Sequence, residues 1–106
     1  MKRYDVRWAT LDPATGSEMA KTRPAVIVSL DALNDRLPTV VICPLTSQLH
    51  PTWRTRIPVR MAGRDAEVAV DQIRTVSKSR LGAKLGRLSD AKAGELRRLI
   101  TEMYGE

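Results

Sequence analysis

The stretch at 11–30 constrains the fold more than any other part of this chain. A turn with Pro and Gly at 12–18 leads to Arg23 and Pro24, and then to the apolar run Ala-Val-Ile-Val at 25–28. Pro24 disfavours helix at Arg23, and a β-branched run bounded by turn residues predicts a short buried strand. Because functional sites tend to form where a rigid strand holds polar groups, we expect a carboxylate, a hydroxyl and a guanidinium to form a site at the start of this strand.

Five short strands separated by turn residues are predicted along the chain. They span Asp5–Leu11, Pro24–Leu30, Thr39–Leu45, Thr55–Met61 and Glu67–Ile73. A single flat antiparallel sheet of such strands would leave exposed edges and one uncovered face. The pattern therefore favours a mainly β fold, a small and partly open barrel.

Two helices accompany these strands. Residues 31–37 are predicted to form a short connecting helix that Asp31 caps and Pro38 stops. Ser89 begins a C-terminal α-helix, and Gly105 ends it. Its apolar side chains form a stripe about wide enough to cover one barrel face. They are Ala93, Leu96, Leu99, Ile100 and Met103.

Length and charge narrow the class of protein. We expect 106 residues to form one domain, 1–106, with a modest core that is mainly aliphatic because the chain has no Phe. The 18 Lys and Arg residues against 12 Asp and Glu residues give a net charge of +6, which favours an anionic partner. Nucleic acid is the first candidate and an acidic protein segment the second. A membrane surface is the third, because no predicted helix has a basic amphipathic face with aromatic anchors.

Several classes of site and location are disfavoured. Cys43 is the single cysteine and falls in an apolar run, which indicates a buried core thiol rather than a nucleophile. No apolar stretch approaches the roughly 20 residues of a membrane span, and the N-terminus lacks a signal peptide's apolar segment, so a cytoplasmic protein is expected. Neither a metal-ligand cluster nor a phosphate-binding Gly-Lys-Ser/Thr loop is present, so no metal or cofactor is expected.

Three side chains are candidates for chemistry on a phosphate. Arg23 presents a fixed fork of donors and stays charged, unless it is simply a solvated Arg beside Pro24. Thr46, after a Pro-Leu corner, offers a hydroxyl donor or is an ordinary turn residue. Glu18 can accept a proton where its environment raises its pKa above the usual value of about 4.3, or it is a solvated loop carboxylate.

The loop at 47–56 and the basic stretch that follows the last predicted strand have more than one interpretation. Trp53 is suited either to stacking on an unpaired base or to covering the barrel end. The single histidine, His50, lies in the same loop and receives no role, because a lone loop histidine is usually incidental. The cations between Arg74 and Arg87 either follow a phosphate backbone or form a solvated face.

Five ordered motifs stand at the spacing of one protein family. They are Arg3-x-Asp5-Val6, Leu11-Asp12-Pro13-x-x-Gly16-Ser17-Glu18, Lys21-x-Arg23-Pro24-Ala25-Val26-x-Val28-Ser29, Pro44-Leu45-Thr46-Ser47, and Asp71 to Thr75 followed by Lys78-Ser79-Arg80-Leu81. On these motifs almost the whole chain resembles the MazF/PemK family of toxin endoribonucleases from type II toxin-antitoxin modules. Two positions depart from the family pattern. Tyr4 replaces the usual Gly, and Met19 replaces the Gln that usually follows Ser-Glu.

The resemblance implies an SH3-like barrel and a metal-independent endoribonuclease that cleaves single-stranded RNA at specific sequences, leaving 2′,3′-cyclic phosphate and 5′-hydroxyl ends. It implies catalytic roles for Arg23 and Thr46, with Glu18 as a candidate for proton transfer. Further RNA contacts are implied at Ser17, Ser47 and Gln72, although Gln72 also fits ordinary strand-edge polarity. The resemblance also implies a homodimer whose groove binds RNA, and an acidic antitoxin segment that folds onto that groove and blocks it.

Two alternatives from other classes stay open. A related toxin of the same fold acts on DNA gyrase by protein contact without cutting RNA, and the Arg23 and Thr46 pair favours the nuclease over it. The other alternative is an RNA-binding module that kept the fold and lost its activity, which the departures at Tyr4 and Met19 keep open.

Overall fold

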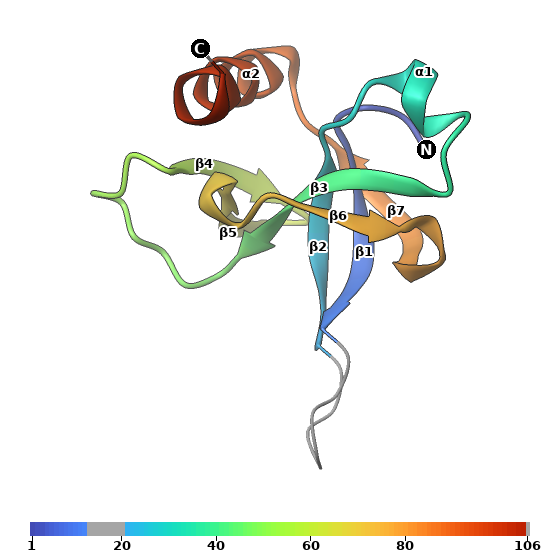
Figure 1. The fold of residues 1–106 in the computed structure, drawn as a ribbon. Coiled ribbons are helices and arrows are strands. Elements are labelled where there is room, and N and C mark those ends of the chain that lie inside the picture. Colours follow the sequence, from blue (N-terminus) through green and yellow to red (C-terminus); the bar gives the residue numbers. More distant parts are fainter. Residues whose placement is uncertain (13–20, 106) are drawn as a thin grey trace.

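The computed structural model describes residues 1–12 and 21–105 (Figure 1). This part of the chain contains seven strands, two α-helices and two short 3-10 turns. They are β1 (Asp5–Asp12), β2 (Lys21–Ile27), α1 (Asp31–Asn34), β3 (Thr39–Thr46), β4 (Arg56–Met61), β5 (Arg64–Ala69), η1 (Val70–Gln72), β6 (Arg74–Ser77), η2 (Lys78–Arg80), β7 (Leu81–Arg87) and α2 (Asp90–Tyr104). No helix in the described residues is both long enough and apolar enough to span a membrane.

The strands form one curled sheet in the order β4-β5-β3-β2-β1-β7, with β6 added on β3. One edge of β3 pairs with β2 over Ile42–Pro44. Its other edge pairs first with β6, over Thr39–Ile42, and then with β5, over Leu45–Thr46. Because β3 changes partner along its length, the sheet bends on itself without closing. The predicted mainly β, partly open barrel with a C-terminal helix is confirmed.

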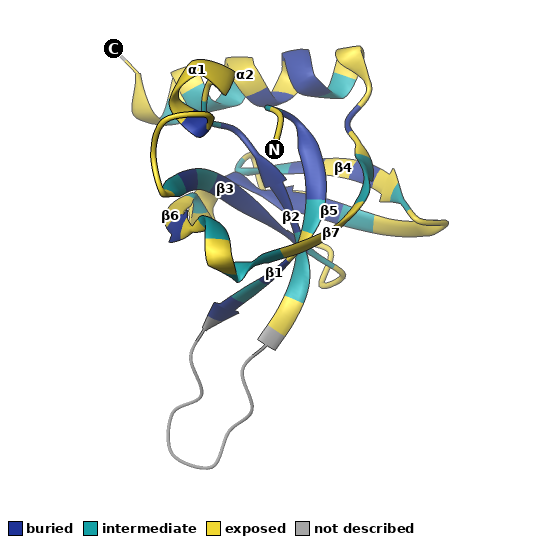
Figure 2. Cartoon of the chain, turned by 90° about the vertical axis from the view of Figure 1, so that its right-hand side faces the viewer, coloured by how far each residue is buried: buried dark blue, intermediate teal, exposed yellow. Residues whose placement is uncertain are grey.

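The central strands are buried on both faces, which explains their continuous apolar runs (Figure 2). On one face Val26 and Leu45 pack in a core that includes Leu96 of α2. On the other face Ile27 and Ile42 belong to a second, smaller core. The ends of these strands extend beyond both cores. The well-packed strands hold the polar side chains at those ends in fixed positions.

The strand predictions differ from the structure in the bounds of β2 and β5 and in the absence of two observed strands from the prediction. The strand predicted at Glu67–Ile73 is confirmed only over 67–69 and is wrong beyond Ala69, because β5 covers 64–69 and the chain then turns through η1. The strand predicted at Pro24–Leu30 is β2, which runs instead from Lys21 to Ile27. Pro24 is tolerated inside this strand because β2 pairs with β3 only over 25–27, so the strand lacks its second neighbour at Pro24. The sequence analysis did not predict β6 or β7, whose side chains are mostly exposed and lack an apolar pattern.

Both predicted helices are present. Ser89 caps α2 by accepting a hydrogen bond from the backbone N–H of Lys92 at 3.2 Å, and the predicted stripe packs against the core. The predicted capping role of Asp31 is wrong, because Leu30 occupies the cap position of α1. The Asp31 carboxylate instead accepts a hydrogen bond from the backbone N–H of Arg3 at 2.7 Å, so it joins the N-terminus to this helix.

Tyr4 adopts a left-handed backbone conformation with φ of 73°. Side chains other than glycine take this conformation at a cost of roughly 1 kcal/mol, which explains why glycine suits the position. Contacts hold the tyrosine in place. Its backbone N–H donates to the Ile27 carbonyl at 2.6 Å, its carbonyl accepts from Leu88, and its buried phenol accepts from Arg97 at 3.3 Å. The tyrosine at this position therefore costs backbone strain but adds a buried, hydrogen-bonded ring to the core.

Comparing Tyr4→Gly with Tyr4→Ala should separate these two contributions. Both variants lose the buried ring, so we expect each to lower the free energy of unfolding by about 3 kcal/mol. Only glycine also relieves the backbone strain, so Tyr4→Gly should be more stable than Tyr4→Ala by roughly 1 kcal/mol. Urea unfolding of the two variants measures this difference. Equal stabilities would show that the left-handed backbone carries no cost.

Candidate active site

Strands β2 and β3 bring Arg23 and Thr46 to the same cavity. The register pairs Ala25 with Pro44, and Arg23 and Thr46 each lie two residues beyond that pair, on the same side of their strands as Ala25 and Pro44. Opposite residues of antiparallel strands point to the same face of the sheet. The cavity has a volume of about 530 Å³. Its lining comprises Trp8, Thr22, Arg23, Pro24, Leu45, Thr46, Ser47, Gln48, Arg64, Asp65 and Ala66.

The Arg23 side chain is available to bind an anion. It is half-buried in the cavity wall, and its guanidinium makes no hydrogen bond or ion pair with any described residue. A guanidinium offers five N–H donors in a rigid fork that matches phosphate oxygens. Arg23 can therefore place two parallel hydrogen bonds on a phosphate without first giving up an internal partner.

The Thr46 hydroxyl is held as a donor. Its Oγ1 accepts a hydrogen bond from the backbone N–H of Gln48 at 3.1 Å. A hydroxyl has one hydrogen to donate, and here the accepted bond occupies the oxygen while leaving that hydrogen free. Thr46 thus offers a second, neutral donor in the cavity that contains the Arg23 guanidinium.

Two further cavity residues were not identified from the sequence. Trp8 falls within the predicted strand Asp5–Leu11 and received no role there, but it is 39% exposed at the cavity wall, opposite Pro24 in the register. It lies on the side of β1 that carries Val6, beyond the end of the core. Arg64 begins β5 after the two-residue turn Ala62-Gly63, and no local sequence pattern distinguishes it from other surface arginines. Together they add a flat aromatic surface and a second cation.

The other predicted site residues are distributed differently. Ser47 lines the cavity next to Thr46. Gln72 lies on η1 and is not part of the cavity lining. Trp53 is also outside it, with its ring stacked on His50 at a centroid distance of 3.8 Å. Ser17 and Glu18 lie outside the described residues, as does the departure at Met19.

Several cations of the basic stretch have partners within the fold. Arg80 donates to the Thr10 carbonyl at 3.3 Å, while Lys84 and Arg87 lie 3.4 and 3.2 Å from the Asp5 carboxylate. Burial alone would raise the pKa of Asp5, but a backbone hydrogen bond and these two cations outweigh it and hold the pKa below its ordinary value. These contacts join η2 and β7 to β1, so this stretch stabilises the fold as well as contributing to the surface charge.

Cys43 is a core thiol, as its sequence context predicted. Its side chain is fully buried in the core beneath α2. Burial, with a smaller effect from the Asp71 charge, raises the pKa of the thiol to about 12, so it stays protonated at neutral pH. Within residues 1–12 and 21–105, no group of three or more His, Cys, Asp or Glu side chains is arranged to hold a metal ion.

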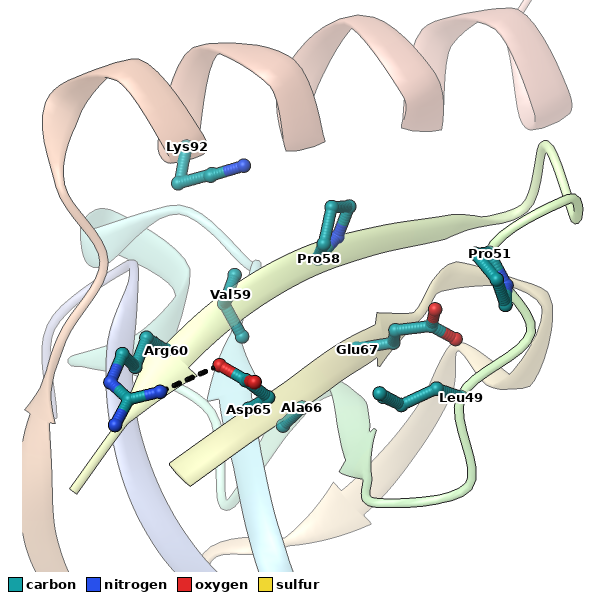
Figure 3. A pocket seen from close by; sticks show the side chains of 9 residues that line it. All are labelled: Leu49, Pro51, Pro58, Val59, Arg60, Asp65, Ala66, Glu67 and Lys92. Carbon is teal, nitrogen blue, oxygen red and sulfur yellow. Dashed lines mark hydrogen bonds and ion pairs between the residues drawn. The ribbon is translucent and has the colours of Figure 1, made fainter. Parts of the chain in front are cut away.

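An apolar groove of about 380 Å³ adjoins the cavity (Figure 3). Asp65 and Ala66 line both spaces. The other residues that line the groove come from the loop after β3, from β4 and β5, and from the start of α2. They are Leu49, Pro51, Pro58, Val59, Arg60, Glu67 and Lys92.

Comparisons with known proteins agree with this fold and its motifs. Residues 2–104 match the family described as "PemK-like, MazF-like toxin of type II toxin-antitoxin system". The chain is 35% identical to Endoribonuclease MazF of Staphylococcus saprophyticus, with 99% of this chain and 92% of that protein covered. Among solved structures, MazE-MazF from Deinococcus radiodurans has a TM-score of 0.85 at 22% identity, covering 99% and 96% of the two chains. A mycobacterial endoribonuclease in complex with its cognate antitoxin has a TM-score of 0.77 at 24% identity, covering 99% and 93%.

Proposed function

Because this chain belongs to the PemK/MazF-like toxin family of type II toxin-antitoxin systems, we propose that it is a sequence-specific, metal-independent endoribonuclease acting on single-stranded RNA. The observation that carries the proposal is that Arg23 and Thr46 line one cavity. Each has hydrogen-bond donors, the guanidinium N–H groups and the hydroxyl, that bind no other described residue. A relative that covers nearly the whole chain is named an endoribonuclease.

The proposed reaction uses a nucleophile that the RNA itself supplies. The 2′-hydroxyl oxygen attacks the adjacent phosphorus and loses its proton to a base, for which Glu18 is our candidate. The bond from phosphorus to the 5′ oxygen then breaks, and that oxygen takes up a proton. The products are a 2′,3′-cyclic phosphate and a 5′-hydroxyl, and no water is consumed.

Arg23 and Thr46 would act on the charge that develops at phosphorus. The guanidinium is suited to the non-bridging oxygens of the phosphorane, and the Thr46 hydroxyl adds a neutral donor to the same group. Such donors are effective because they are already in place before the reaction begins. Since a guanidinium stays protonated at any working pH, we assign Arg23 an electrostatic role and leave proton transfer to other groups.

Single-stranded RNA suits this cavity for two reasons. An unpaired strand allows the 2′-hydroxyl to swing into line with the phosphorus, whereas a duplex holds it away. The exposed ring of Trp8 in the cavity wall is suited to stacking on an unpaired base, and Ser47 and Gln48 add polar groups beside it. Unstacked bases also expose their edges to the protein, which is how a cleavage sequence would be read. The cytoplasm, where RNA is available, is the proposed site of action.

We propose that the partner which controls this activity is an acidic antitoxin. Two solved structures similar to this chain hold a toxin together with its antitoxin. The net charge of +6 favours an acidic segment that folds over the cavity and competes with RNA. RNA contacts by Ser17, Gln72 and Trp53 remain part of the proposal.

We also propose a homodimer. Leu30, Leu33 and Leu37 follow one another at helical spacing around α1 and are each about half exposed, which leaves an apolar surface for a second copy to cover. Sedimentation equilibrium at micromolar concentration should give the mass of two chains. A mass of one chain across this range would count against the dimer.

Cleavage in the presence of EDTA tests the proposed function. Purified protein should cut a long unstructured RNA into discrete fragments that carry cyclic phosphate and 5′-hydroxyl ends, with EDTA and without it. Raising the salt concentration should weaken RNA binding steeply, because phosphate contacts release counterions. Fragment ends can be assigned by mass spectrometry and by their response to polynucleotide kinase.

Three outcomes would contradict the proposal. Cleavage that stops in EDTA would require a metal, and fragments with 3′-hydroxyl ends would require another nucleophile. An intact RNA that is nevertheless bound would favour the inactive binding module. A supercoiling assay with purified DNA gyrase covers the remaining alternative.

A further inference from the structure

A buried ion pair lies beneath the loop that follows Thr46. Arg56 opens β4 and Glu67 is on β5, and their side chains are only 6% and 4% exposed. Nη1 of Arg56 is 3.5 Å from Oε1 of Glu67. Burying two charges costs several kcal/mol per ion before their attraction is counted, so the pair is a weak source of stability by itself.

Neutralising Arg56 does not require Glu67. The Asp71 carboxylate lies on the same guanidinium, with Oδ1 2.9 Å from Nε. Burial alone would raise the pKa of Asp71, but hydrogen bonds from Arg56 and Thr55, a backbone hydrogen bond and the Arg56 charge together outweigh it and lower the pKa. Arg56 therefore already has a charged counter-ion at closer range, and the second carboxylate needs another explanation.

Both members of the pair hold the backbone of the loop after β3. Glu67 Oε1 accepts a hydrogen bond from the backbone N–H of His50 at 2.9 Å, and Arg56 Nη1 donates to the Gln48 carbonyl at 3.5 Å. The Arg56 guanidinium also lies 4.7 Å from the centre of the Trp53 ring. Figure 3 shows the Glu67 carboxylate pointing from β5 toward the loop segment that carries Leu49 and Pro51.

These loop contacts end at the proposed catalytic hydroxyl. The two anchored groups are the Gln48 carbonyl and the His50 N–H. The backbone N–H of Gln48 lies between them and Thr46, and it donates to Thr46 Oγ1. A shift of Gln48 would free that oxygen and let the hydroxyl rotate away from the phosphate. We propose that Glu67, together with Arg56, is a positioning residue that holds the 48–50 backbone and thereby keeps Thr46 aimed into the cavity. This inference rests on the proposed function.

The test compares Glu67→Met with Glu67→Gln. Methionine has a similar volume but accepts no strong hydrogen bond, whereas glutamine keeps an oxygen for the His50 amide and loses only the charge. Cleavage at saturating RNA should fall about 10- to 100-fold in Glu67→Met, because a displacement near 1 Å is enough for such a loss. Glu67→Gln should retain most of the rate, and the RNA concentration at half saturation should change little in either variant.

Combining each variant with Thr46→Val separates positioning from general destabilisation. If Glu67 acts through the Thr46 hydroxyl, Glu67→Met should cause little further loss in the Thr46→Val background, since coupled residues are not additive. A full additional loss there would overturn the proposal. Equal losses in the Gln and Met variants would also overturn it, because the charge rather than the hydrogen bond would then matter.

Amide hydrogen exchange gives a readout that does not depend on cleavage. The Gln48 and His50 amides should exchange faster in Glu67→Met and near the wild-type rate in Glu67→Gln. If wild-type protein cuts no RNA, the proposed function fails, while the exchange rates still decide whether Glu67 holds the loop. Should Glu67→Met fail to fold, the double variant Arg56→Met/Glu67→Met removes both charges and the same anchor, and unchanged exchange there would overturn the inference.

Discussion

Replacing Arg23 with alanine should lower the rate of RNA cleavage by at least about 100-fold, the usual cost of removing one pre-aimed donor from a developing charge. The fold should be unaffected, since Arg23 is bonded to no other described residue and its loss leaves no buried group unpaired. Arg23→Lys keeps the charge but loses the planar fork, so we expect it to recover only part of the rate. Single-turnover cleavage of a synthetic RNA measures all three proteins.

Arg98→Ala is the matched control for the loss of charge. Arg98 is exposed on α2 and does not line the cavity, so this variant should weaken RNA binding slightly through net charge and leave the cleavage step unchanged. Thr46→Val should also slow cleavage while keeping the shape of the side chain. Full activity in Arg23→Ala would remove Arg23 from the site and leave the motif as an inherited feature of the fold.

Replacing Arg56 with methionine should lower the free energy of unfolding by about 3 kcal/mol or more, the usual cost of breaking a buried ion pair from one side. The variant leaves the carboxylate of Glu67 buried, with the His50 amide as its one remaining partner among the described residues. It also removes the bond to Asp71, whose lowered pKa should then rise. Urea unfolding at pH 7 measures the change in stability.

Arg60→Met provides the comparison for a surface pair. Arg60 and Asp65 lie as close as 2.8 Å, yet their side chains are 68% and 71% exposed. Because exposed pairs contribute between about 0 and 1 kcal/mol, this variant should be nearly as stable as the wild type. A similar loss in Arg56→Met and Arg60→Met would contradict the role given to burial.

Strands with buried side chains were predicted from the sequence, whereas strands with mostly exposed side chains were not. β3 was predicted at 39–45 and observed at 39–46, because a strand buried on both faces needs a continuous apolar run with visible ends. β7 contains two glycines and two basic residues and was not predicted, because its place depends on backbone pairing with β1. Backbone pairing leaves little trace in the order of side chains.

Some residues of the candidate site could be identified from the sequence, and others only from the structure. Arg23 and Thr46 stood out because Arg23 precedes Pro24 at the start of one apolar run and Thr46 follows Pro44-Leu45 at the end of another, within motifs that carry the family resemblance. Trp8 and Arg64 did not, since nothing local separates an aromatic at a cavity wall from one in a core. The pair of Arg56 and Glu67 joins two strands of a hairpin to a loop, and residues so combined are not neighbours in sequence.

The sequence by itself determined the class of fold, the family and the two residues on which the proposed chemistry depends, because buried apolar runs and short motifs are local properties of the chain. Only the tertiary structure decided what surrounds them. The pairing of β2 with β3 directs Arg23 and Thr46 into one cavity, and the curl of the sheet brings Trp8 and Arg64 to the same cavity. Those distances depend on strand pairing and burial, which are interactions between segments far apart in the chain.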